Sequence, residues 1–194
     1  MTVNFWFDPA CPFTWRTSRW VRDVADRRGE TVHWRPMSLT ILNGGREVPE
    51  EYRAPMAWSA GALRVLAATD ERHGQAAVDR LYTAIGTRLH EQDADRTTVL
   101  AGALADAGLP ADLAEAADDA GFDKTVRESH DAGQARVGTE SGSPITAVDD
   151  GPGFFGPVVV PVPDPDAADR LFEAMRLLST VPQFSELKRA RNQF

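Results

Sequence analysis

Apolar and polar residues alternate along the first forty positions in a way that predicts a strand, a helix and a second strand. The apolar, aromatic run Val3–Phe7 is typical of a short buried strand. Over Pro12–Arg28 the apolar residues recur at helical spacing, between a proline at the start and a glycine just past the end. Residues 31–39 alternate again and predict a second strand, which Pro36 places at or near a sheet edge.

The rest of the chain first becomes helical and then returns to short apolar runs. From about residue 55 to 137 the pattern predicts several consecutive helices. It breaks at four places, near residues 73–74, 91–93, 108–110 and 120–121. We then expect a strand over 143–148, another over 154–162, and an amphipathic helix that opens at Asp164-Pro165, with aspartate as the cap and proline at the first helical position.

The order of elements is therefore β-α-β, a block of helices, and β-β-α. Two parallel strands joined by one helix form a βαβ unit, whose sheet needs cover from further elements. We expect an α/β fold in which residues 1–48 and 138–194 form one domain and residues 49–137 form an all-helical insertion.

Composition narrows the class of protein and its partners. The 194 residues are 42% hydrophobic and 26% charged, which is typical of a soluble globular protein. Since 29 acidic residues outnumber 21 basic ones, the net charge is −8, and we expect neither nucleic acid nor an anionic membrane as a partner. The sequence opens without a basic, apolar leader, and no run approaches the roughly 18 apolar residues of a membrane span. Together with the lack of paired cysteines, this predicts a cytoplasmic protein.

The single cysteine, Cys11, excludes an internal disulfide, a Cys-x-x-Cys pair and a multi-cysteine zinc site, and we expect no metal. Cys11 falls at the predicted strand-to-helix junction. The first turn of a helix has unpaired N–H groups and a partial positive charge, which predicts a stabilised thiolate and a lowered pKa. Pro12 pre-sets the backbone, the N–H groups of Phe13 and Thr14 can face the sulfur, and the Thr14 hydroxyl can donate to it. A lone cysteine is more often a core residue, but this position favours a working thiol.

The segment around this cysteine, DPACPFTW at residues 8–15, resembles the active site of the DsbA-like branch of the thioredoxin superfamily. It is more similar still to the FrnE-like and mycothiol-dependent reductase subgroup of actinobacteria, whose motif continues as Thr-Ser-Arg-Trp, here residues 17–20. The resemblance covers essentially the whole chain. It implies a thioredoxin-like fold interrupted by a helical insertion.

A second segment also resembles this family. Gly138-Thr139 and the Gly-Ser-Pro turn that ends at Pro144 are similar to the loop that carries a cis-proline in this fold. The resemblance implies that Pro144 faces Cys11 and that the backbone of Ser143 pairs with the substrate.

The chain departs from the family at one position, because Thr14 stands where a second cysteine is usual. Cys-Pro-Phe-Thr cannot close its own disulfide, so we expect a monothiol mechanism. The Cys11 thiolate would attack a small-molecule or protein disulfide, and an external small thiol would resolve the mixed disulfide. The resemblance implies mycothiol as that thiol. A homodimer is left open.

Further candidate substrate contacts are Phe13, Trp15, Asn43 and Tyr52. Asn43 lies in a loop that borders the cleft in the resembling family, although the glycines beside it also suit a plain turn. Phe13 and Tyr52 could line an apolar pocket, although aromatic side chains are more often core. Asp8 is either a turn residue or a proton-transfer group.

Two other function classes remain open. One is a transferase or isomerase similar to the kappa-class glutathione transferases, in which the first helix activates the thiol of a bound cosubstrate and no protein cysteine is needed. The other is a redox-inactive binding module that has lost its second cysteine. Replacing Cys11 by serine should preserve activity only in the first of these two.

Overall fold

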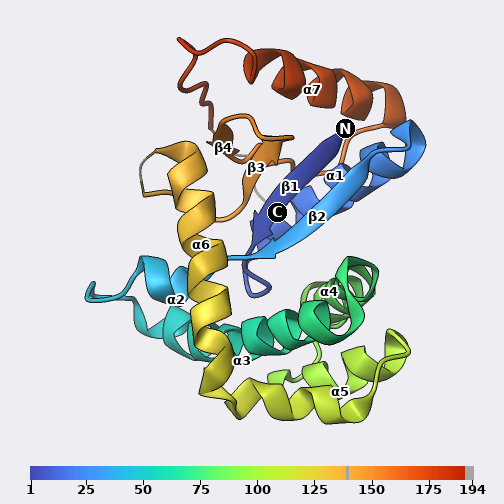
Figure 1. Ribbon diagram of the computed structural model, residues 1–194, viewed down its shortest axis with the longest axis vertical. Coiled ribbons are helices and arrows are strands. Elements are labelled where there is room, and N and C mark those ends of the chain that lie inside the picture. Colours follow the sequence, from blue (N-terminus) through green and yellow to red (C-terminus); the bar gives the residue numbers. More distant parts are fainter. Residues whose placement is uncertain (139, 191–194) are drawn as a thin grey trace.

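A four-stranded sheet with the strand order β2-β1-β3-β4 forms the centre of the fold in a computed structural model, which describes residues 1–138 and 140–190 (Figure 1). β1 is parallel to β2 and antiparallel to β3, and β3 is antiparallel to β4. The strands are β1 (Thr2–Phe7), β2 (Thr31–Pro36), β3 (Ile145–Val148) and β4 (Gly153–Phe155). The parallel β1–β2 pair and the β3–β4 hairpin confirm the predicted α/β class and element order.

Helices cover both faces of this sheet (Figure 1). α1 and α7 pack together on one side, while α6 crosses the other, where the Trp6 indole donates to the Ser129 carbonyl at 2.9 Å. Gly133 permits this close approach, because a Cβ there would lie 2.8 Å from the Trp6 ring. The helices are α1 (Pro12–Arg28), α2 (Leu39–Leu42), α3 (Glu50–His73), α4 (Gln75–His90), α5 (Arg96–Asp106), α6 (Asp123–Val137) and α7 (Pro165–Leu178), with short 3-10 segments η1 (Ala111–Asp118) and η2 (Ala120–Phe122).

The hydrophobic core follows from the period-two alternation of β1. Val3, Phe5 and Phe7 all point to the face that α1 covers, where they join one large cluster of buried side chains. The same cluster includes Leu63 of α3 and Tyr82 of α4, and the Phe7 and Tyr82 rings stack with their centroids 3.9 Å apart. Because this core runs from the sheet into the helices of residues 49–137, the division into two domains stays a prediction.

Local signals located the helices better than the strands. α1 has the predicted bounds, and at the start of α7 the Asp164 carboxylate accepts from the Ala167 N–H at 2.9 Å. The second strand was predicted too long: it ends at Pro36, since Ser38 caps α2 with its hydroxyl. The strand predicted over 154–162 was also too long, because β4 ends at Phe155. The prolines at 157 and 161 have no N–H to donate to a ladder.

Within the described part of the chain, no helix is both long and apolar enough to cross a membrane.

Candidate active site

Cys11 is the N-cap residue of α1 and lies where two loops that are distant in sequence meet. Its backbone is extended, its N–H donates to the Asp8 carbonyl at 3.1 Å, and its carbonyl accepts from the Trp15 N–H at 3.0 Å to begin the helix. The Cys11 Sγ is 3.9 Å from the carbonyl oxygen of Ser143, in the loop before β3. Register brings the loops together, because Trp6 near the end of β1 pairs with Ile145 at the start of β3.

The loop opposite the sulfur contains the cis-proline that the resemblance implied. The Ser143–Pro144 peptide bond is cis. The buried Ser143 hydroxyl accepts from the Thr14 hydroxyl at 2.8 Å and from the Asp8 N–H at 3.0 Å. Thr14 therefore links the first turn of α1 to this loop. Thr139, which was predicted to belong to the same motif, lies outside the described residues.

Burial raises the pKa of the Cys11 thiol above its ordinary value, so the predicted lowering was wrong. The Thr14 side chain and the N–H groups of Thr14 and Phe13 act to lower that pKa, but the sulfur accepts no capping hydrogen bond from the helix. Transfer of the sulfur out of water outweighs them, and the negative charge of Asp8 adds to the rise. Cys11 is part-exposed as a residue, but protein atoms surround its sulfur, and this burial disfavours the thiolate.

Beside the thiol, the carboxyl group of Asp8 is 1% exposed and ties three segments together. One oxygen accepts from the Ala10 N–H at 2.9 Å and from the Ser59 hydroxyl of α3 at 2.5 Å. The other accepts from the Leu39 N–H at the start of α2, at 2.8 Å. Burial raises the pKa of Asp8, against these hydrogen bonds. Asp8 is thus a buried anchor of the site, and more than a turn residue.

Sequence reasoning missed Ser59, the partner of Asp8. Ser59 is buried in an alanine-rich helix, 51 positions away along the chain. Its only local signal is a small polar residue on an apolar helix face.

The predicted substrate contacts fall into different environments. Phe13 is half-buried and Pro12 is exposed, both in the first turn of α1 beside Cys11. Tyr52 is 56% exposed in the first turn of α3. Asn43 follows the last residue of α2, and its side-chain amide donates to the carbonyl of Leu39, the first residue of that helix. Among the described residues, no hydrogen bond joins Tyr52 or Asn43 to Cys11.

Trp15 is buried in the first turn of α1 and packs among the residues that surround it. Its side chain is only 1% exposed, its indole N–H donates to Glu91 at 3.2 Å, and the Arg19 guanidinium lies 4.0 Å from the ring centroid. The ring also neighbours that of His90, whose Nε2 lies 2.9 Å from the Pro9 carbonyl oxygen. Trp15 is therefore a core residue and presents no open ring face to a substrate.

Comparisons with known proteins show which family this chain is related to. The sequence model of the Rv2466c-like family, described as mycothiol-dependent nitroreductase Rv2466c, matches residues 10–189. The uncharacterized protein Rv2286c of Mycobacterium tuberculosis is 35% identical over 196 residues, which cover 98% of this chain and 83% of that protein.

Two solved structures show the same fold. One is a 2-hydroxychromene-2-carboxylate isomerase, with a TM-score of 0.64 and 14% identity, over 93% of this chain and 95% of that one. The other, described as a probable DsbA oxidoreductase from Streptomyces coelicolor, has a TM-score of 0.59 and 19% identity, over 98% and 94% of the two chains. These likenesses confirm the thioredoxin-like fold with its helical insertion.

Proposed function

This chain belongs to the family of the mycothiol-dependent nitroreductase Rv2466c, and we propose on that premise that it is a thiol-dependent oxidoreductase that works through Cys11. One observation carries the proposal: the only thiol of the chain belongs to the N-cap residue of α1, and its Sγ lies 3.9 Å from the Ser143 carbonyl oxygen, beside cis-Pro144. A disulfide that pairs with the Ser143 backbone would then present a sulfur atom to Cys11.

The mechanism that we propose is monothiol exchange. Cys11 loses its proton, and the thiolate attacks one sulfur of the substrate disulfide. A new S–S bond forms while the old one breaks, and the other half of the substrate leaves as a thiolate that takes up a proton. The thiolate of mycothiol then attacks the mixed disulfide, which frees Cys11 and releases a disulfide between mycothiol and the retained half. Thr14 hydrogen-bonds the Cys11 thiolate and cannot itself resolve the mixed disulfide.

Several finer assignments belong to the same proposal. We place the chain in the FrnE-like, mycothiol-dependent subgroup, in the cytoplasm, with a small-molecule or protein disulfide as its substrate. Phe13, Asn43 and Tyr52 are the proposed substrate contacts.

Mass spectrometry after treatment with mycothiol and an oxidant tests this function. We expect one mycothiol adduct on Cys11, faster at pH 9 than at pH 7, because the raised pKa leaves little thiolate at neutral pH. Cys11→Ser should form none, while Thr17→Val, which alters a buried hydroxyl of the same helix, should form the adduct normally. A wild-type protein without adduct at either pH would sink the proposal. If it also lacked turnover, a redox-inactive binding module would remain.

A second function has one observation in its favour. The raised pKa of Cys11 suits a site in which the α1 terminus activates the thiol of a bound cosubstrate, as in kappa-class glutathione transferases. The Cys11→Ser variant separates the two functions, because it would retain turnover in the transferase or isomerase and lose it in the monothiol enzyme.

A further inference from the structure

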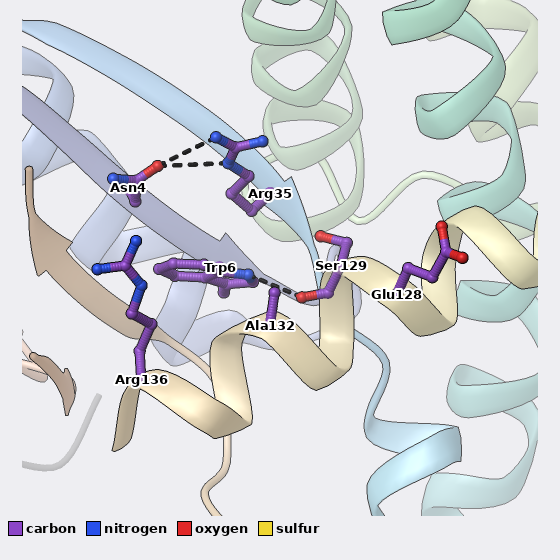
Figure 2. Close-up of a pocket in the computed structure, with 7 residues that line it drawn as sticks. All are labelled: Asn4, Trp6, Arg35, Glu128, Ser129, Ala132 and Arg136. Atoms are coloured by element: carbon purple, nitrogen blue, oxygen red, sulfur yellow. Dashed lines mark hydrogen bonds between the residues drawn. The ribbon is translucent and has the colours of Figure 1, made fainter. Parts of the chain in front are cut away.

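A second site lies on the other face of the sheet, away from the cluster that contains Phe5 and Phe7. An open cavity of about 360 Å³ lies between part of the sheet and α6 (Figure 2). Its base is the Trp6 ring, which is 3% exposed and fixed by its hydrogen bond to the Ser129 carbonyl. Figure 2 shows Arg35 of β2 on one side of this ring and Arg136 of α6 on the other.

Arg35 brings a positive charge that no carboxylate neutralises within the described residues. Its Nε and Nη2 donate to the Asn4 side-chain oxygen at 3.3 and 3.2 Å, and Nη2 also lies 3.3 Å from the His33 Nδ1. Neither partner is a carboxylate, and Nη1 is left for another acceptor. A half-buried guanidinium without a counter-ion attracts an anion more strongly than an exposed one, because water screens it less.

Arg136 and Ser129 add two more donors. Arg136 donates to the Gly151 carbonyl at 2.8 Å and to Asp150 at 3.2 Å. Because Asp150 is fully exposed, this ion pair neutralises Arg136 only weakly. The Ser129 hydroxyl is buried and has no hydrogen-bond partner among the described residues, although it borders the cavity. A buried hydroxyl normally finds a partner, so an acceptor is missing at this point.

We propose that this cavity binds a small metabolite through a single oxyanion group, a carboxylate or a phosphate ester. The oxyanion accepts from the guanidinium groups of Arg35 and Arg136 and from the Ser129 hydroxyl, which gives each unused donor an acceptor. Glu128 lies on the rim, paired with Lys124 at 3.7 Å, and the whole chain carries a net charge of −8. This negative surrounding disfavours polyanions and limits the ligand to one oxyanion group.

Titration with inorganic phosphate and, separately, with acetate tests the site, at constant ionic strength, with the Trp6 indole N–H and the arginine Nε–H signals followed by NMR. We expect saturable shifts at Trp6 and Arg136. A response to phosphate alone identifies a phosphate ligand, a response to acetate alone a carboxylate, and a response to both the shared oxyanion chemistry. No saturable shift with either anion would overturn the proposal.

Variants show whether the two arginines are responsible. Arg35→Gln should weaken binding roughly tenfold or more, because a charge-assisted donor is lost, and Ser129→Ala by a smaller factor. Arg53→Gln removes the same charge from an exposed arginine of α3 and should leave binding unchanged. If Arg35→Gln folds poorly, Arg136→Gln takes its place. Unchanged affinity in the arginine variants of the cavity would overturn the site, while Cys11 alkylation should stay at the wild-type rate throughout.

Discussion

The Cys11 site, just beyond the end of β1, and the cavity beside α6 differ in how their polar groups are paired. In the Cys11 site, Asp8, Thr14 and Ser143 share their hydrogen bonds, and each of these three side chains has a partner. In the cavity, the Ser129 hydroxyl has none among the described residues, and Arg35 contacts no carboxylate there. A network in which every polar group is hydrogen-bonded holds a reactive group in place, whereas donors without an acceptor can bind a ligand. The comparison separates a preorganised reaction site from a cavity that is complete only when occupied.

Removal of Asp8 should have the largest effect, because it opens the closed network at its centre. Asp8→Ala leaves the Ser59 hydroxyl and the N–H groups of Ala10 and Leu39 without their acceptor. We expect a loss of about 3–5 kcal/mol in the free energy of unfolding, because three donors lose their acceptor and each buried donor left unpaired costs about 1–3 kcal/mol. Urea denaturation measures it.

The exposed Asp26 of α1 supplies the matched control, and Asp26→Ala should change stability by less than about 0.5 kcal/mol. Equal stabilities of the two variants would show that the Asp8 contacts contribute nothing to the fold.

A matched pair of serines tests the comparison directly. Ser59→Ala leaves the buried Asp8 carboxyl short of a donor and should cost about 1–3 kcal/mol. Ser129→Ala removes a hydroxyl that has no partner to lose, so we expect no more than about 0.5 kcal/mol in either direction. Thermal and urea unfolding of both variants measure the difference. A larger loss of unfolding free energy in Ser129→Ala would mean that the Ser129 hydroxyl already has a hydrogen-bond partner and that the Cys11 site and the cavity do not differ in this respect.

Elements with local signals could be predicted from the sequence, and contacts between distant segments could not. Proline and glycine at the ends of α1 gave its bounds, and Asp164 marked the start of α7. The position of Cys11 as an N-cap followed from the same signals. The direction of its pKa shift did not, because it depends on how closely the Ser143 loop crowds the sulfur, 132 positions further along the chain.

The cavity shows the same limit. Arg35 and Arg136 belong to different elements, and only the packing of α6 against the sheet brings them to one space. Neither residue stands in a motif, so the pattern of either segment alone predicts only a strand or a helix.

The smallest expected effect concerns the Thr14 hydroxyl, which stabilises the Cys11 thiolate against the cost of burial. Thr14→Val keeps the shape but removes the hydroxyl, so the pKa of Cys11 should rise further. The pH dependence of Cys11 alkylation measures the change. In wild type, the rate should keep rising with pH beyond about 8.5, the ordinary pKa of a thiol, and the Thr14→Val curve should lie further toward alkaline pH.

The same pKa predicts the direction of a stability change. A thiol whose pKa is raised in the folded state contributes stability below its unfolded pKa and loses that stability as the pH rises through the folded value. Wild type should therefore lose stability relative to Cys11→Ala above about pH 8.5, in the window where the unfolded thiol ionises first.

The control for the alkylation experiment is Thr17→Val, whose native hydroxyl donates to the Pro157 carbonyl. This variant should leave the Cys11 alkylation curve at its wild-type position. Coincident curves for Thr14→Val and wild type would mean that the hydroxyl serves only the Ser143 loop. Helix α1 would then stabilise the thiolate through its backbone N–H groups alone.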